Sequence, residues 1–247
     1  MHPFTDSCDM PKVSGNASAK RRSRAALVIT IDGPAGVGKS TVAKLLARRL
    51  GLLYLDTGAT YRALAYDALL NNIDPKDQRG VVRLSRRARI WLRESVDGVR
   101  VLLNGEDVTR KIRTERVTEA AAAIAQHPRV RAEMVRLQRR LAKSDRVIAE
   151  GRDTGSVVFP RAPHKFFLTA KTTIRARRRR SEMQAVQGNS PRLEVIAQQL
   201  RHRDHLDRSR SVGPLVRPPD AIVLDTTSLS VHQVVARMLQ HLPPTIA

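Results

Sequence analysis

Short apolar segments alternate with helix-like patterns along most of this chain. The first segment, residues 27–31 (LVITI), is almost continuously apolar and rich in β-branched residues, which is typical of a strand buried on both faces of a parallel sheet. A glycine-rich turn follows, and valine and leucine then recur at helical spacing up to Gly51, a residue suited to end a helix. Strands that alternate with helices predict a parallel sheet covered on both faces. Further strands are predicted at 52–55, 147–149, 165–168 and 221–224, and further helices at 59–71 and after Ser230, which can form a capping box with Gln233.

The middle of the chain interrupts this alternation. Residues 90–108 contain Asp97-Gly98 and Asn104-Gly105, each between strand-like runs, and both dipeptides favour the type I′ turn of a β-hairpin. Two helices are expected after this segment, separated near Pro128. We therefore predict a small antiparallel sheet followed by helices, inserted into the α/β chain as a substrate subdomain.

The glycine-rich turn carries the clearest chemical signal. Residues 33–41 read GPAGVGKST and match the phosphate-loop pattern GxxxxGK[ST] between a strand and a helix. Backbone N–H groups of such a loop curl around a phosphate, and the helix N-terminus adds partial positive charge. An ordinary glycine-rich turn is the alternative, but the Lys-Ser pair and both flanking elements favour the phosphate loop. The predicted ATP-binding residues are Gly33, Pro34, Ala35, Gly36, Val37, Gly38, Lys39, Ser40 and Thr41, with Lys39 reaching the β- and γ-phosphates and Ser40 as a ligand of Mg²⁺.

A phosphate loop does not specify what accepts the phosphoryl group. The sequence lacks the NKxD pattern that reads guanine, which disfavours a GTPase. Arginine is placed as a kinase would need it, at Arg62, Arg152 and Arg210 in separated segments and in the run 175–180 (RARRRR). A guanidinium group can form two hydrogen bonds to the oxygens of one phosphate. Phosphoryl transfer gains most from positioning and charge neutralisation. These features favour a small-molecule kinase.

The charge balance is strongly basic. The 247 residues include 45 Lys and Arg against 23 Asp and Glu, a formal net charge of +22. Such a balance points to polyanionic partners, or to an arginine-rich solvated surface in a GC-rich genome. A nucleic-acid-binding phosphate-loop protein is therefore the rival from a different class, although only 3% of the residues are aromatic, which disfavours a reader of single strands.

The N-terminal segment and the cysteine content bear on where the protein works and which partners it has. Residues 1–25 lack periodicity and include the basic cluster KRRSR, which predicts a disordered basic tail that can attract nucleic acid without being needed for catalysis. Cys8 is the single cysteine, which excludes a disulfide within one chain. No apolar run is long enough for a membrane span and no signal peptide is recognisable, so we expect a cytoplasmic monomer without a membrane partner.

Five segments together resemble one family closely. ITIDGPAGVGKST, LDTGATYRALA, NGEDVTRKIRT, EGRDTGSVVFP and RDHLDRSRSVGPL follow the order and spacing of the bacterial cytidylate kinases, from about residue 27 to 242. The resemblance implies transfer of the γ-phosphoryl of MgATP to CMP or dCMP, in pyrimidine nucleotide metabolism. It also implies a five-stranded parallel sheet flanked by helices, with an inserted α+β CMP-binding subdomain and a helical lid. The implied divisions are a tail at 1–25, a phosphate-loop kinase core at 26–85 and 147–247, the CMP-binding insert at 86–146 and the lid at 171–190.

The same resemblance implies a role for each site residue. It places Thr57, Arg62 and Arg152 on the acceptor phosphate. It places Arg131, Asp153 and Arg210 on the cytosine edge, and Tyr61, Arg203 and Asp207 near the sugar. The implied catalytic residues are Lys39 and the lid arginines Arg175, Arg178 and Arg179. Ala122 stands where the family can place a serine near the base. Asp32 and Asp153 are both candidates to hold water on Mg²⁺.

Overall fold

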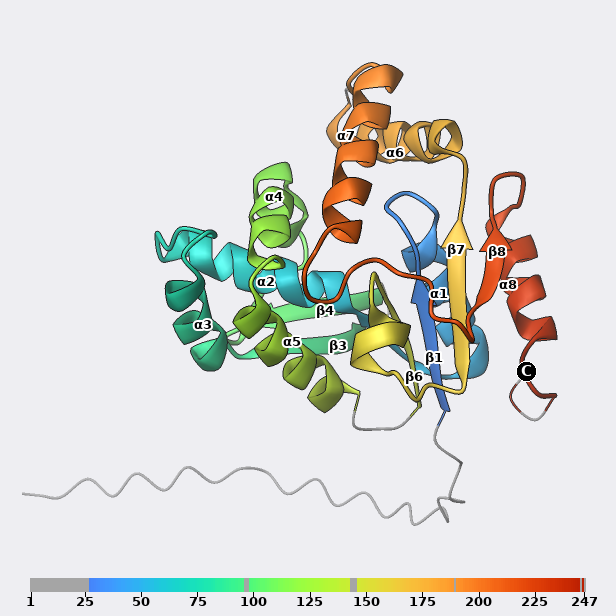
Figure 1. Ribbon diagram of the computed structural model, residues 1–247, viewed down its shortest axis with the longest axis horizontal. Coiled ribbons are helices and arrows are strands. Elements are labelled where there is room, and N and C mark those ends of the chain that lie inside the picture. The colour runs from blue at the N-terminus through green and yellow to red at the C-terminus, as the bar shows by residue number, and fades with distance from the viewer. Residues whose placement is uncertain (1–26, 96–97, 143–145, 189, 245, 247) are drawn as a thin grey trace, which may run out of the picture.

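The protein is described by a computed structural model that covers residues 27–95, 98–142, 146–188, 190–244 and 246. Figure 1 shows an α/β body with a helical hairpin projecting from one edge. The predicted tail at 1–25, with Cys8, and the Asp97 half of the first predicted turn lie outside the described residues.

A five-stranded parallel sheet forms the centre of the molecule. Its strands are ordered β2-β6-β1-β7-β8, so the phosphate-loop strand β1 lies between strands that come much later in the chain. The five strands predicted from sequence are confirmed, with shifts of a residue or two at their ends. Their bounds are β1 (Leu27–Asp32), β2 (Leu53–Asp56), β6 (Arg146–Gly151), β7 (His164–Thr169) and β8 (Ile222–Asp225).

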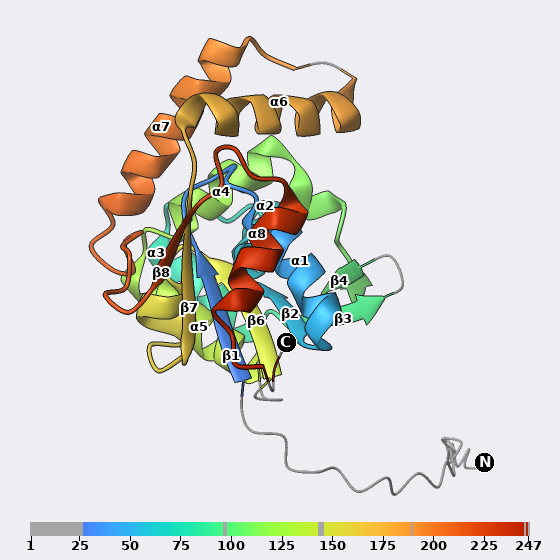
Figure 2. The ribbon, with the colours of Figure 1, turned by 90° about the vertical axis from the view of Figure 1, so that its right-hand side faces the viewer.

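Helices α1 (Lys39–Leu50) and α8 (Val231–Gln240) cover one face of this sheet (Figure 2). Alternate residues of β1 pack there with Val42, Leu46 and Met238 in one hydrophobic cluster. Helix α1 ends at Gly51, whose φ of 61° is left-handed, and the predicted capping box at the start of α8 is confirmed in both directions.

The predicted insert packs around a second hydrophobic cluster. Strands β3, β4 and β5 form an antiparallel sheet, and Asn104 and Gly105 have φ values of 52° and 93°, as the predicted type I′ turn requires. Buried alanines of α2 pack against alanines of α4, which lets the two helices approach closely. Helix α3 was not predicted, because only Gly80, Val81 and Val82 of its basic sequence are buried. The bounds are α2 (Thr57–Leu70), α3 (Gln78–Arg87), β3 (Ile90–Ser95), β4 (Gly98–Leu103), β5 (Glu106–Asp107), a 3₁₀ turn η1 (Lys111–Arg113), α4 (Glu115–Ile124) and α5 (Pro128–Leu141).

The projecting hairpin consists of α6 (Thr172–Gln187) and α7 (Leu193–Arg208), which stand above the carboxyl ends of the central strands (Figures 1 and 2). A short π-helical segment η2 (Thr154–Val158) follows β6. No helix in the described part of the chain combines the length and the apolar character needed to cross a membrane.

Candidate active site

The phosphate loop lies at the carboxyl end of β1 and leads directly into α1. Lys39 is buried, and its ammonium group donates to the carbonyl oxygen of Pro34 at 2.8 Å. Burial and the nearby charge of Arg152 lower the pKa of Lys39 to about 7, and the Glu150 carboxylate offsets part of this effect. A Cβ at Gly33 would lie 2.2 Å from the carbonyl oxygen of Leu168, so the loop can sit this close to β7 only with glycine there.

Glu150 is a site residue that the sequence reasoning missed. Its Oε1 accepts from the Ser40 hydroxyl at 2.6 Å and from the Tyr54 hydroxyl at 3.0 Å. Glu150 lies in β6, the direct neighbour of β1, and it therefore reaches the phosphate loop across the sheet. An acidic residue directly after the apolar run 147–149 was the available signal.

A pocket of about 440 Å³ joins the phosphate loop to the insert. Most of the predicted site residues meet there, although they come from six separate segments of the chain. Gly33, Pro34, Val37, Arg175 and Arg178 do not line it. The predicted residues that do line it are Ala35, Gly36, Gly38, Lys39, Ser40, Thr41, Thr57, Tyr61, Arg62, Arg131, Arg152, Asp153, Arg179, Arg203, Asp207 and Arg210.

The three predicted lid arginines have different environments. The Arg175 guanidinium is buried, donates to the carbonyl oxygen of Ala35 at 3.1 Å and pairs with Asp204 of α7 at 2.7 Å. Arg178 donates to the carbonyl oxygens of Val37, at 3.3 Å, and Thr226, at 2.6 Å. Both side chains therefore bind backbone carbonyl oxygens of the phosphate loop and do not line the pocket. Arg179 lines the pocket instead, with its guanidinium 3.3 Å from Glu182.

The start of α2 brings a basic group to the pocket. Asp56 caps this helix by accepting from the Ala59 amide at 2.8 Å, and its second oxygen pairs with Arg62 at 2.8 Å. Burial raises the pKa of Asp56, but Arg62 and Arg113 outweigh it and the pKa lies below its usual value. The neighbouring Thr57 hydroxyl donates to the carbonyl oxygen of Glu150 at 2.8 Å.

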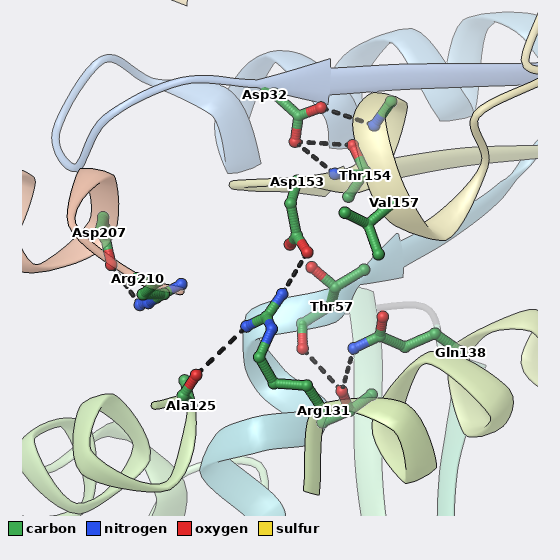
Figure 3. Close-up of polar contacts among 12 residues, drawn as sticks. Asp32, Thr57, Ala125, Arg131, Gln138, Asp153, Thr154, Val157, Asp207 and Arg210 are labelled. Carbon is green, nitrogen blue, oxygen red and sulfur yellow. Dashed lines mark hydrogen bonds and ion pairs between the residues drawn. The ribbon is translucent and has the colours of Figure 1, made fainter. Parts of the chain in front are cut away.

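Arg131 and Asp153 form a buried ion pair across the pocket from the phosphate loop (Figure 3). Arg131 comes from α5 and also donates to the carbonyl oxygen of Ala125 at 3.4 Å. Its guanidinium lies over the Tyr61 ring, 5.7 Å from the centroid. A hydrogen-bond donor and an acceptor therefore stand side by side at this end of the pocket.

Asp207 of α7 binds two arginines at once. Its carboxylate accepts from Arg152 at 2.7 Å and from Arg210, the latter contact being visible in Figure 3. Burial raises the pKa of Asp207, but these two charges outweigh it and the pKa falls below the usual range. Burial and the charge of Arg152 lower the pKa of Arg203 to about 10, which reflects the excess of positive charge around the pocket.

Some of the residues that line the pocket carry buried polar atoms without a hydrogen-bond partner. The Nε groups of Arg62, Arg131 and Arg210, and the hydroxyl of Tyr61, have no hydrogen-bond partner among the described residues. Unpaired buried donors are costly, so the pocket is suited to a ligand rich in acceptors and negative charge.

Asp32 is fully engaged elsewhere. Its carboxylate accepts from the amide and hydroxyl of Thr154, both at 2.8 Å, and from the amide of Gly155 at 2.7 Å (Figure 3). Asp153 is paired with Arg131. Of Glu150, Asp32 and Asp153, Glu150 is the one with a hydrogen bond to Ser40.

The sequence model of the cytidylate kinase family matches residues 29–243. A cytidylate kinase of Geobacillus sp. (strain WCH70) is 48% identical over 212 residues, which cover 86% of this chain and 94% of the relative. Cytidylate kinases of Carboxydothermus hydrogenoformans and Symbiobacterium thermophilum are 44% and 43% identical, over 86% and 87% of this chain and 95% of each relative.

Gly213 is a second residue that the sequence reasoning missed. It has a left-handed φ of 63°, and a Cβ there would lie 2.0 Å from Nη2 of Arg131 and 2.5 Å from Oδ2 of Asp153. The loop after α7 therefore closes directly over the buried ion pair. The amide of Leu215 donates to the carbonyl oxygen of Asp207 at 2.8 Å and fixes the loop in this position.

We expect Gly213→Ala to lower the free energy of unfolding by about 2–4 kcal/mol, because it combines a strained φ with a clash against a buried ion pair. Gly188→Ala is the matched control, since Gly188 has a φ of 70° but no atom within 4 Å of an added Cβ. The control should lose only about 1 kcal/mol, the share that comes from φ. Urea unfolding of both variants measures the difference, and equal losses would show that the loop does not press on the pair.

Proposed function

The chain belongs to the cytidylate kinase family, and on that premise we propose that it transfers the γ-phosphoryl group of ATP to CMP or dCMP, giving CDP or dCDP and ADP. The reaction belongs to pyrimidine nucleotide metabolism, and we propose that the protein is cytoplasmic. One observation carries the proposal: a phosphate loop and a cluster of paired arginines line the same pocket from opposite sides.

We propose the following division of the pocket. Thr57, Arg62 and Arg152 bind the acceptor phosphate, which their place between the phosphate loop and the Arg131–Asp153 pair supports. Arg131, Asp153 and Arg210 read the cytosine edge, and their buried donors and carboxylate support this role. Tyr61, Arg203 and Asp207 lie next to these groups and face the sugar. The unit around the second hydrophobic cluster then acts as the CMP-binding subdomain, and the α6–α7 hairpin acts as the lid.

The chemistry needs no general base. An acceptor phosphate oxygen is already anionic at neutral pH, so the protein has to align it with the γ-phosphoryl group and neutralise charge. Lys39 carries this charge on the loop side, and phosphates beside its amine favour the ammonium form over the neutral form that burial favours. Arg179 is the lid arginine that faces the pocket, and we assign it to the transferred group.

The site fits Mg²⁺, the ion that ATP-dependent kinases use. Mg²⁺ prefers oxygen ligands and is usually held by one or two protein groups together with substrate phosphates and water. The Ser40 hydroxyl and the Glu150 carboxylate, in contact at the phosphate loop, supply such groups. When bound, Mg²⁺ neutralises charge on the phosphates. We propose that Ser40 is its direct ligand, that Glu150 orients Ser40 and the metal's water, and that Tyr54 holds Glu150 in place.

A coupled ADP-release assay across CMP, dCMP, UMP, AMP, GMP and dTMP tests the proposed function. We expect CMP and dCMP to be the substrates and the kcat/KM for UMP to be lower by at least about 10²-fold, since uracil mismatches the donor and acceptor at Arg131 and Asp153. Asp153→Asn should weaken CMP use and narrow the gap to UMP, because the amide can turn a donor toward O4. Asp56→Asn, the control, should slow both acceptors alike through Arg62. A wild-type enzyme that uses UMP as well as CMP would refute the base-reading model.

We expect Glu150→Gln to raise the Mg²⁺ concentration needed for half-maximal rate and to lower kcat, while stability changes little because the amide oxygen still accepts from Ser40 and Tyr54. Asp67→Asn provides the control, since Asp67 is a buried carboxylate of α2 outside the pocket. The rate is measured against Mg²⁺ at saturating nucleotides. An unchanged Mg²⁺ dependence in Glu150→Gln would remove this residue from the metal site.

The α6 arginines should separate into two classes. Arg179→Ala should lower kcat by about 10²-fold without loss of stability, as expected when a positioned charge is removed from the transferred group. Arg175→Ala should lower the free energy of unfolding by about 3–5 kcal/mol, because it leaves Asp204 buried and unpaired. Arg177→Ala, exposed on the same helix, should change neither quantity. If all three variants lowered kcat equally, the arginines would act through a general electrostatic field and not as a specific lid.

A further inference from the structure

The outer face of the β3–β4 hairpin carries an unusual combination of side chains. Trp91 is 61% exposed there, next to Leu102 on the neighbouring strand, while Ile90 of β3 points into the second hydrophobic cluster. A hollow of about 480 Å³ lies against the Trp91 side chain and is lined by Arg89, Trp91, Leu102, Asn104 and Gly105. An indole exposed to this extent beside a hollow is suited to stack on a flat ring.

Arginines surround this tryptophan. Arg93 follows Trp91 on the same face of β3, and its direct partner across the strands is Arg100. Two like charges in such a pair destabilise a sheet unless an anion lies between them. Arg100 has only a long ion pair of 3.8 Å with Asp107, and Arg89 and Arg93 have no carboxylate at ion-pairing distance among the described residues.

We propose that this tryptophan face, made of Arg89, Trp91, Arg93, Arg100 and Leu102, binds single-stranded nucleic acid. A base stacks on Trp91 in the hollow, and the flanking phosphates lie on Arg93 and Arg100. Trp91 and Arg93 are about 6–7 Å apart along the strand, roughly the length of one extended nucleotide. Sequence-tolerant single-strand binding needs this pairing of a stacking platform with basic groups, and a duplex keeps its bases out of reach.

Charge decides between this occupant and a second copy of the chain. A two-fold contact through the tryptophan face would bring its three arginines against the same three on the partner. Among the described residues, Asp107 is the one carboxylate at ion-pairing distance from them. A polyanion is complementary instead, both to this face and to a chain of net charge +22. The sequence is poor in aromatic residues, but its single tryptophan stands at the position where stacking is required.

This face is separate from the kinase pocket. The opposite side of the hairpin packs on α2 through Ile90, Val101 and Leu103, and α2 lies between the hairpin and the pocket. None of the five residues of the tryptophan face lines that pocket. The proposal therefore stands or falls independently of the kinase activity, which serves as a measure of correct folding in each variant.

The single tryptophan provides a direct probe in the full-length protein. We expect a short oligouridylate or oligothymidylate strand to quench its fluorescence saturably, with affinity that falls steeply as salt rises, and a duplex of the same length to quench it much less. Trp91→Ala should weaken binding about tenfold, measured by the anisotropy of a labelled strand. CMP turnover should stay unchanged.

A charge-matched pair of variants tests the arginines. Arg93→Gln/Arg100→Gln should reduce affinity about tenfold or more and lower the salt dependence. Arg86→Gln/Arg136→Gln removes the same charge from side chains of 67% and 66% exposure on α3 and α5, and should have little effect. Three outcomes would overturn the proposal. The strand could bind without quenching Trp91, or both double variants could lose the same affinity for the strand. Trp91 fluorescence could also fall as the protein concentration rises without any strand, which would indicate self-association.

Discussion

Pairing of buried arginines with carboxylates is the interaction on which the site depends. The pocket gathers guanidinium groups that would repel one another in a poorly solvated space, and an isolated buried charge is costly. Four of them are paired with carboxylates: Arg62 with Asp56, Arg131 with Asp153, and Arg152 and Arg210 with Asp207. The Arg131–Asp153 and Arg152–Asp207 pairs join α5 and α7 to the segment after β6, whereas the Arg62–Asp56 pair lies within the start of α2. They hold α5 and α7 in place around the pocket.

The phosphate loop is shaped from outside as well as by its glycines. Arg175 and Arg178 donate hydrogen bonds to the carbonyl oxygens of Ala35 and Val37, which point away from the pocket. In a trans peptide the carbonyl and the following N–H point in opposite directions. Anchoring these carbonyls outward therefore turns the amides of Gly36 and Gly38 toward the pocket. The same arginines belong to α6, so the position of the α6–α7 hairpin and the shape of the loop are mechanically linked.

Small side chains explain how the insert reaches the pocket. The alanines of α2 and α4 pack closely, with Ala63 fully buried, and on the pocket side Ala121 and Ala122 form part of the wall. A larger residue in this run would push α4 away from α2 or fill the pocket. The alanine run at 120–123, which has no chemical signal of its own, thus limits the width of the pocket on this side.

The sequence by itself determined the local features. The phosphate loop, the five strands, the Asn104-Gly105 turn and the α8 cap depend on periodicity and on residues close in the chain, and the family motifs brought most pocket residues with them. Tertiary structure decided which residues contact one another. It brings Glu150 to Ser40 and Gly213 to Arg131, and it places Arg175 on the carbonyl oxygen of Ala35 and not in the pocket. Ser40 and Glu150 are separated by 110 positions, and Ala35 and Arg175 by 140. Such contacts follow from the strand order, which places β6 and β7 on either side of β1, and no local pattern in a single sequence encodes that order.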